Sequence, residues 1–394
     1  MRMARYHRAA SRTLPVKKTV SSCGPDVGCC GPAFEHDLGD GVLTCAGWRD
    51  DWKMSARSGF GTGTGIAWGF GLPLVYRERS TTLGRLERIR QFGGETACEA
   101  AVSTALEWLK VNQNADGSWG QNDPCAMTGL ALLAFLGRFE TPESPFYGDT
   151  VLNGVKFLVQ SSQRHPRRLI SIHAEGSLAE LENAVSSCAM GEMYAAARLG
   201  SKAIPGMREA FEEGMKLIVA NDKVAAPSDG VAIAWSFQAV RAAKQTGLKI
   251  PGLHEALQLD LKQSLAAFEK GLDPETPASV LLVGLQCLTR APDEALQRSL
   301  GELANPTNFG TQDLRARYFE SLGLFQVGGD KWFPFEQKMR TTLLAAQADD
   351  GKFELPHSPL YDMESQCLSI LMLESYYRFR RGHMRDEMEN FICR

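Results

Sequence analysis

The sequence predicts an all-α fold in which six helical hairpins close into an α/α toroid. Apolar residues recur at helical spacing from residue 95 to residue 381. Segments that are apolar on one side alternate with segments that are apolar on nearly all sides, as outer and inner helices do. The last segment, 362–379, is too apolar to end an open array in water, so we expect it to pack against the first hairpin.

The first predicted hairpin illustrates this alternation. Its outer helix begins near Glu95 and carries one apolar stripe at helical spacing, with charged residues off the stripe. The stripe consists of Cys98, Val102, Ala105, Leu106 and Leu109. The following segment, Met127–Leu136, is apolar on nearly all faces, which predicts an inner helix surrounded by other helices.

The same alternation, with Gly, Pro or Asn in the turns, predicts ten further helices that complete the six hairpins. These are 149–163, 182–199, 205–220, 230–244, 254–270, 277–288, 293–303, 312–327, 335–347 and 362–379. The predicted organisation is therefore an arm over residues 1–94, a toroid over 95–381 and a C-terminal tail over 382–394.

Composition excludes several classes of protein. The 394 residues, 44% hydrophobic and 23% charged, are long enough for two or three average domains and are typical of a globular chain. The net charge of −3 gives no basic excess that would favour nucleic acid or an anionic membrane. No apolar run approaches the roughly 20 residues that span a bilayer, so we expect no integral membrane protein.

Residues 1–94 are predicted to form a basic, Cys- and Gly-rich arm that is mostly irregular. The first 18 residues contain six basic residues and no acidic one, without the apolar stretch of a secretory signal. A basic tail is favoured, and an organellar targeting segment remains the alternative. The glycines between Gly59 and Gly71 match neither G-x-G-x-x-G nor a P-loop, which excludes nucleotide binding.

The cysteines fall into two groups. Those of the arm lack a C-x-x-C pair, so their role stays open; they are Cys23, Cys29, Cys30 and Cys45. Five others lie singly among apolar neighbours, as small buried residues do. These five are Cys98, Cys125, Cys188, Cys287 and Cys367. Unpaired buried thiols predict a reduced, cytoplasmic protein.

Two predicted turns share a motif in which Gln is followed by Gly at +4 and by an aromatic residue at +6. The copies are Gln113, Gly117 and Trp119, and Gln347, Gly351 and Phe353. Gly permits a left-handed helix end, and Gln can bond loop backbone. The motif resembles the Gln–Trp repeat of the prenyltransferase and squalene-cyclase family, and Phe325–Trp332 is similar to a segment of its bacterial members.

The resemblance covers about the last three-quarters of the chain, and the middle repeats have lost the Gly and the aromatic residue. It implies an α/α toroid whose central cavity opens where the N-termini of the inner helices converge. The acidic residues at or near these predicted helix starts are Asp123, Glu182, Asp229, Glu275, Asp313, Asp362 and Glu364. Helix capping is the favoured interpretation of them. Asp229, Asp313 and Asp362 are the weak catalytic candidates.

The chemistries that the resemblance implies lack their signatures here. No Asp-x-Asp-Asp acid of a class II cyclase occurs, nor the Cys-Gly-Glu-Gln of thioester domains. Trp235, Tyr318 and Tyr361 are expected to line the cavity, although core packing is their default role.

A zinc site like that of the protein prenyltransferases is only weakly supported. Asp123 and Cys125 have the family's Asp-x-Cys spacing, but Asp362 stands where the family's His is expected. His357 is the remaining candidate ligand. We therefore predict no metal or cofactor.

The leading hypothesis is a binding protein whose central cavity holds an isoprenoid, another lipid or a peptide. The first alternative is an isoprenoid cyclase or prenyltransferase with a non-standard acid or metal site. The second is a protein–protein interaction scaffold. Because one fold hosts many functions, the residues at the cavity rim decide among them. The ligand and the oligomeric state are not predicted by the sequence.

Overall fold

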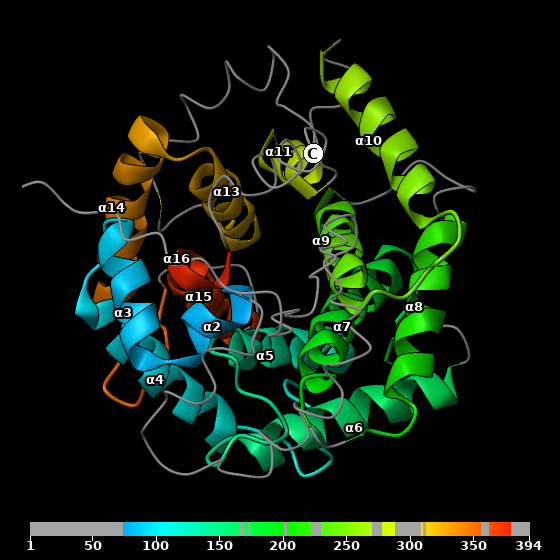
Figure 1. The fold of residues 1–394 in the computed structure, drawn as a ribbon, viewed down its shortest axis with the longest axis horizontal. Helices are drawn as coiled ribbons and strands as arrows, with labels where there is room; N and C mark the ends of the chain where they lie inside the picture. Colours follow the sequence, from blue (N-terminus) through cyan, green and yellow to red (C-terminus); the bar gives the residue numbers. More distant parts are fainter. Residues whose placement is uncertain are drawn as a thin grey trace, which may run out of the picture. The chain divides into compact units, whose positions relative to one another are not determined.

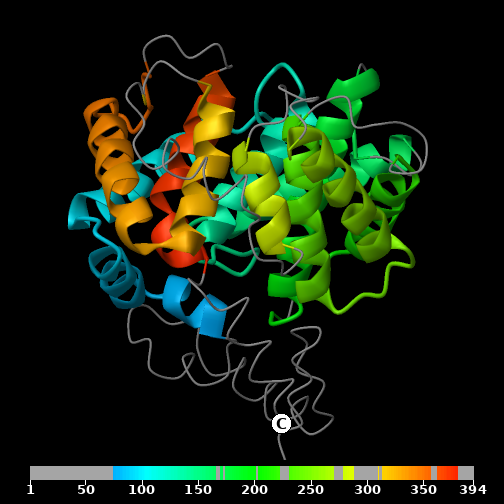
Figure 2. The ribbon, with the colours of Figure 1, turned by 90° about the horizontal axis from the view of Figure 1, so that it is seen from above.

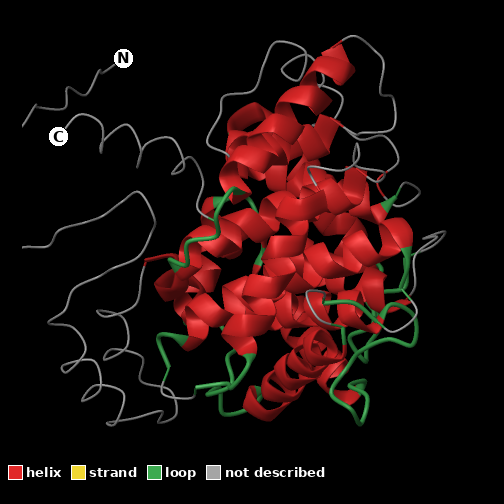
Figure 3. Ribbon diagram, turned by 90° about the vertical axis from the view of Figure 1, so that its right-hand side faces the viewer, coloured by secondary structure: helices red, strands yellow, loops and turns green. Residues whose placement is uncertain are grey.

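All regular structure among the described residues is helical (Figure 3), which confirms the all-α prediction. The computed structural model describes residues 74–165, 169–171, 174–200, 203–221, 230–269, 278–287, 309, 313–355 and 362–379. All of them belong to one unit of the chain, Asp37–Arg394. The arm's four cysteines, the predicted helix 293–303 and the tail lie outside the described residues.

The helices alternate along the chain between two layers. The N-terminal pair is α2 (Leu74–Ser80) and α3 (Thr82–Gln91). The outer layer consists of α4 (Thr96–Val111), α6 (Gly148–Arg164), α8 (Met207–Asn221), α10 (Leu253–Glu269) and α14 (Gly329–Ala345). The inner layer consists of α5 (Pro124–Gly137), α7 (Gly176–Ala197), α9 (Gly230–Thr246), α11 (Ala278–Cys287), α13 (Leu314–Val327) and α15 (Asp362–Leu373), and α15 is followed by α16 (Ser375–Arg378).

The inner helices contact one another in chain order. Helix α5 contacts α7, α7 contacts α9, and the series continues through α11 and α13 to α15. Helix α15 also contacts α5, and the outer helix α14 contacts α4. Figure 1 shows α4, α6, α8, α10 and α14 lying outside these six helices, and Figure 2 shows the bundle from above.

Burial distinguishes the two layers. Every residue of α5 from Cys125 to Gly137 is buried, and so is every residue of α15 from Glu364 to Leu373. The outer α4 buries only one side, which includes the predicted stripe. Full burial of a large apolar side chain stabilises a fold by roughly 1.5–3 kcal/mol, so the inner helices supply much of the folding free energy.

The repeated motif ties each turn to a neighbouring outer helix. The side-chain amide of Gln113 donates to the carbonyls of Gly117 and of Thr150 in α6, both at 2.9 Å. That of Gln347 donates to Gly351 at 3.3 Å and to Ala101 in α4 at 2.8 Å. The second copy therefore links the C-terminal hairpin to the first described outer helix of that layer.

The glycine and the aromatic residue of each motif complete the turn. Gly117 and Gly351 have φ of 90° and 94°, a region that L-residues with a side chain rarely adopt. Trp119 is fully buried and donates its indole N–H to the carbonyl of Leu109 at 2.7 Å. Phe353 is buried as well. The aromatic side chain thus anchors the turn to the core while the glycine provides its geometry.

The largest differences from the predicted helix ranges concern three helices. Helix α7 begins at Gly176 rather than at 182, and α14 begins at Gly329, so that Pro334 lies inside it. The early start of α14 buries Trp332, whose indole donates to the carbonyl of Phe92 at 2.8 Å. Predicted helix 362–379 divides at Glu374 into α15 and α16.

The helices α2 and α3 lie in the stretch that the sequence predicts to be mostly irregular. Their side chains are largely polar, so the apolar periodicity that marks the other helices is weak. In α3 only Arg85 and Ile89 are buried. Buried ion pairs rather than an apolar face hold these helices, which explains why a hydrophobic pattern did not predict them.

We expect Gly351→Ala to destabilise the protein more than Gly176→Ala. Both glycines have positive φ, so each substitution costs about 1–2 kcal/mol of left-handed strain. A Cβ at Gly351 would also lie 2.4 Å from the carbonyl oxygen of Thr104 in α4, whereas nothing lies within 4 Å of one at Gly176. Free energies of unfolding from urea denaturation measure the difference. Equal losses of unfolding free energy in the two variants would show that the turn at Gly351 does not pack closely against α4.

Candidate functional site

The N-terminal ends of the inner helices carry Glu182, a carboxylate that is fully buried. One of its oxygens accepts the N–H of Cys125 at 3.2 Å, and the other accepts the N–H and hydroxyl of Ser171 at 2.7 and 2.9 Å. Burial raises the pKa of Glu182, and the bonds from Ser171 oppose that rise. Glu182 therefore joins α7 to the start of α5 and has no oxygen left without a partner.

Asp123, Arg315 and Glu364 lie at this same end. Asp123 precedes α5 with a left-handed φ of 50°, and its side chain caps no helix N–H. Burial raises the pKa of Asp123, and the charge of Arg315 opposes the rise. Arg315 in turn binds both oxygens of Glu364, at 2.5 and 2.8 Å. The structure thus brings together three of the predicted rim residues, Asp123, Glu182 and Glu364. It also places Arg315 beside them, which was not predicted.

Two of the weak catalytic candidates have ordinary structural roles. Asp313 is exposed and accepts the N–H of Arg315 at 3.0 Å as the cap of α13. Asp362 is 78% exposed at its side chain and forms an ion pair with Lys352 at 2.8 Å. The third candidate, Asp229, lies outside the described residues, as do Glu275, Tyr361 and His357.

The two described aromatic residues expected to line the cavity pack against each other. The rings of Trp235 and Tyr318 stack with centroids 5.3 Å apart, and Phe319 meets the indole edge-on at 5.6 Å. Trp235 and Tyr318 are both buried, and Gln238 donates to the Tyr318 hydroxyl at 3.4 Å. These side chains form a closed aromatic layer between α9 and α13, in the N-terminal halves of both helices.

Cys125 has the properties of a core thiol. It is fully buried, and burial together with the nearby Glu182 raises its pKa to about 12. Among the described residues, no group of three or more His, Cys, Asp and Glu side chains is placed to hold a metal ion. Cys98, Cys188 and Cys367 are likewise buried and form no disulfide.

The opposite end of the inner helices holds a set of buried and partly buried charged residues that was not predicted from the sequence. We call it the charge cluster. It consists of Arg79, Arg85, Glu99, Arg138, Glu192, Arg241, Glu374 and Arg378. These residues come from α2, α3, α4, α7, α9 and α16 and from the segments that follow α5 and α15. The cluster therefore joins the N-terminal pair and the last helix to the inner layer.

Glu192 lies at the centre of one half of the charge cluster. One carboxylate oxygen accepts from Arg241 at 2.8 Å and from Arg378 at 3.1 Å. Burial raises the pKa of Glu192, but Arg378, Arg241 and Arg79 together have the larger effect and lower it to about 2. Glu192 is consequently ionised, and it is the anion around which three guanidinium groups gather.

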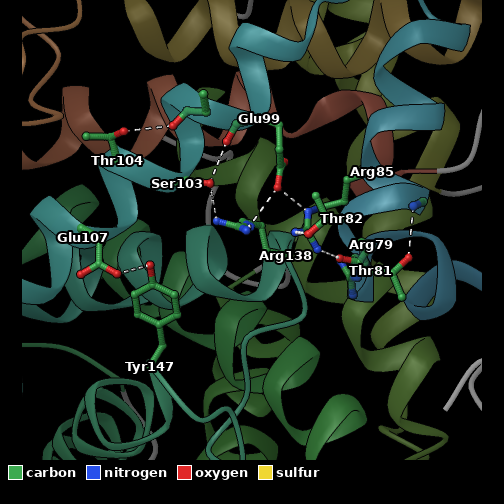
Figure 4. Close-up of polar contacts among 12 residues, drawn as sticks. Arg79, Thr81, Thr82, Arg85, Glu99, Ser103, Thr104, Glu107, Arg138 and Tyr147 are labelled. Atoms are coloured by element: carbon green, nitrogen blue, oxygen red, sulfur yellow. Dashed lines mark hydrogen bonds and ion pairs between the residues drawn. The ribbon is translucent and has the colours of Figure 1, made fainter. Parts of the chain in front are cut away.

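Glu99 organises the other half (Figure 4). Its carboxylate lies 2.8 Å from Arg85 and 3.2 Å from Arg138. Arg85 also donates to the backbone carbonyl of Arg79 at 2.8 Å, and Arg138 to the hydroxyl of Ser103 at 2.9 Å. These bonds fasten α2 and α3 to α4 and to the end of α5.

Glu374 is the least satisfied member of the charge cluster. It is fully buried, and neither carboxyl oxygen has a hydrogen-bond partner. Its side chain lies against the backbone of Gly137, where an added Cβ would overlap it. Burial raises the pKa of Glu374 well above its ordinary value, although Arg378 and Arg138 oppose the rise. The environment of Glu374 therefore disfavours its ionised form.

A sequence signal for this end does exist. Glu192 stands within the small and apolar run Ala184–Ala197, and Glu374 and Arg378 lie within the predicted helix 362–379, which was expected to be buried. Charged residues at positions expected to be buried require partners. Which arginines provide them depends on tertiary contacts, because Glu192 and Arg378 are 186 residues apart in the chain.

One open pocket lies away from both ends, on the outer layer. It has a volume of about 450 Å³ and is lined by α6 residues and by the segment before α8, including Leu152, Val159, Ile204 and Pro205. Lys156 and two glutamines complete its polar part. The pocket faces outward between α6 and α8, so it is distinct from the central cavity expected from the sequence.

No family model matches this sequence, and no curated protein or solved structure matches it either. The resemblance to the prenyltransferase and squalene-cyclase family therefore remains a prediction. No helix among the described residues is long and apolar enough to cross a membrane.

We expect Glu374→Gln to stabilise the protein increasingly as pH rises above about 4.5. The pKa of Glu374 is raised in the folded state, so the folded protein binds this proton more tightly than the unfolded chain. Wild-type stability is thus lost as pH rises from the unfolded pKa toward the folded one, and glutamine removes that loss. Melting temperatures at pH 5 and pH 8 measure it, with exposed Glu255→Gln as the control. A difference that does not grow with pH would contradict the prediction.

Proposed function

We propose that the chain is a closed α/α toroid of six hairpins, related in architecture to the prenyltransferase and squalene-cyclase family. The contacts of α15 with both α13 and α5 support closure, as does the bond from Gln347 to the Ala101 carbonyl in α4. Each inner helix would then have two inner neighbours and an outer cover. The outer helix of the fifth hairpin falls on residues 293–303, outside the described residues.

We further propose that this toroid binds an apolar small molecule, an isoprenoid or another lipid, at the end where the inner helices begin. The observation that carries the proposal is the contrast between the two ends. The C-terminal end is filled by the charge cluster and covered by α2 and α16. The N-terminal end has the aromatic layer of Trp235, Tyr318 and Phe319 just inside it.

The aromatic layer suits an apolar ligand better than a strongly charged one. Rings that stack on each other at 5.3 Å offer large apolar faces. A ligand that separates them would replace ring–ring contact with ring–ligand contact and bury its own apolar surface, at roughly 25 cal/mol per Å². Asp123, Arg315 and Glu364 at the rim would contact its polar end.

An enzyme remains the second candidate, and one observation favours it. Asp123 is a half-buried carboxyl that caps no helix, and burial raises its pKa. A carboxyl in that state is suited to donate a proton to a ligand at the rim. Asp313 and Asp362 are occupied by capping and by a surface ion pair, so Asp123 replaces them as the preferred acid.

We expect the purified full chain to bind farnesol or oleate, and Trp235→Leu to weaken that binding at least tenfold. The leucine removes the stacking face while keeping an apolar side chain of moderate size. Isothermal titration calorimetry measures the affinity, and circular dichroism confirms that the variant is folded. Phe333→Ala, at an exposed aromatic residue of α14, is the matched control and should bind as the wild type does. Equal affinity in all three proteins, or none in the wild type, would contradict the proposal.

Closure predicts that Gln347→Ala loosens the first outer helix of the toroid as well as the last hairpin. Its side chain bonds Ala101 in α4, whereas Gln113 bonds Thr150 in α6. Hydrogen exchange followed by mass spectrometry should show faster exchange in α4 for Gln347→Ala and in α6 for Gln113→Ala. Faster exchange confined to α14 and α15 in Gln347→Ala would favour an open array.

A further inference from the structure

Hydrogen-bond donors outnumber acceptors around Glu192. The guanidinium groups of Arg79, Arg241 and Arg378 all act electrostatically on this one carboxylate. Tyr76 belongs to the same group, because its ring lies beneath the guanidinium group of Arg79. Arginine has only donors, and the charge cluster as a whole contains five arginines and three glutamates, an excess of two positive charges.

Several of these donors are buried without a partner. The Nε atoms of Arg79, Arg241 and Arg378 and the hydroxyl of Tyr76 have no hydrogen-bond partner, and one oxygen of Glu192 is the unpaired acceptor among them. Arg79, Arg378 and Tyr76 are each at least 96% buried, with exposures of 2%, 2% and 4%. Leaving a buried donor unpaired is costly, and more so for a charged group. Such a group of convergent donors is typical of a site that receives an anion.

The contacts that do exist orient the arginines without neutralising them. Arg79 lies over the ring of Tyr76 at 4.7 Å, and Arg241 lies over the ring of Phe379 at 4.2 Å. Arg378 donates to the backbone carbonyl of Leu133 at 3.1 Å.

We propose that Tyr76, Arg79, Arg241 and Arg378 form a binding site for an oxyanion, a phosphate or carboxylate group, beside Glu192 at the C-terminal end of the inner helices. Guanidinium groups bind such oxygens through paired N–H donors, and the Tyr76 hydroxyl supplies one more. Burial raises the pKa of the Tyr318 hydroxyl and the charge of Arg378 opposes the rise, so this anion site adjoins the aromatic layer on its C-terminal side.

Helix α2 supplies both Tyr76 and Arg79, so it also controls access. It is seven residues long and contacts α3 and α16. In Figure 2, α2 and α3 lie along one edge of the bundle, beside the last helix of the chain. An anion would enter as α2 lifts and would then hold α2 down through Arg79. Binding of the anion and docking of α2 are therefore coupled.

The test is titration of the full chain with inorganic phosphate, and separately with acetate, by isothermal titration calorimetry at constant ionic strength set with sodium chloride. Saturable binding of phosphate or acetate supports the site, and the anion that binds more tightly shows whether the site prefers a phosphate or a carboxylate group. We expect Arg79→Gln and Tyr76→Phe each to weaken binding at least tenfold. Exposed Arg208→Gln, which removes an arginine of α8, should leave it unchanged.

A second readout covers the case in which Arg79→Gln does not fold. Arg79→Lys keeps the charge but loses the planar donor pair, so it should fold and still bind more weakly. Phosphate should also slow hydrogen exchange in α2 of the wild type, because the anion holds Arg79. Absence of saturable binding in the wild type overturns the proposal. So does binding that is equal in the wild type, Arg79→Lys and Tyr76→Phe, since the anion would then lie elsewhere.

Discussion

The structure depends on one constraint, which is that its inner helices are apolar on every side. Helices α5 and α15 are buried along almost their whole length, so neither can face water on any side. A helix of this kind needs neighbours all round, and the outer helices with one apolar stripe provide only part of that cover. The remaining cover comes from other inner helices, which is why α5, the first of them, contacts both α7 and α15.

The same constraint determines where charge is placed. Within an apolar layer a charged side chain is stable only beside partners, and the partners available differ at the two ends. At the N-terminal end, carboxylates accept backbone N–H groups or pair with single basic residues, as Glu182 and Glu364 do. At the C-terminal end, arginines predominate and converge on Glu192 and Glu99.

The sequence predicted those features that arise from local periodicity. The all-α class, the alternation of outer and inner helices and the glutamine turns follow from spacing alone, and the described residues agree with them. Boundaries that depend on tertiary packing were not predicted. Helix α14 continues through Pro334 because burial of Trp332 and its bond to Phe92 outweigh the lost backbone bond. The charge cluster also escaped prediction, since it joins Glu192 of α7 to Arg378 of α16, which are 186 positions apart in the chain.

The arrangement of charge agrees with the electrostatics of the helices themselves. An α-helix carries partial positive charge at its N-terminus and partial negative charge at its C-terminus. Arg138 and Arg241, which stand at or near the ends of α5 and α9, are therefore stabilised by nearby carbonyls. Arg378 shows this directly, because it donates to the carbonyl of Leu133 in α5. These carbonyl oxygens balance part of the positive charge of the arginines but leave their Nε atoms unpaired. A bound anion would balance the rest of that charge. If the anion binds only when α2 is docked, its concentration determines how much of the protein has α2 docked.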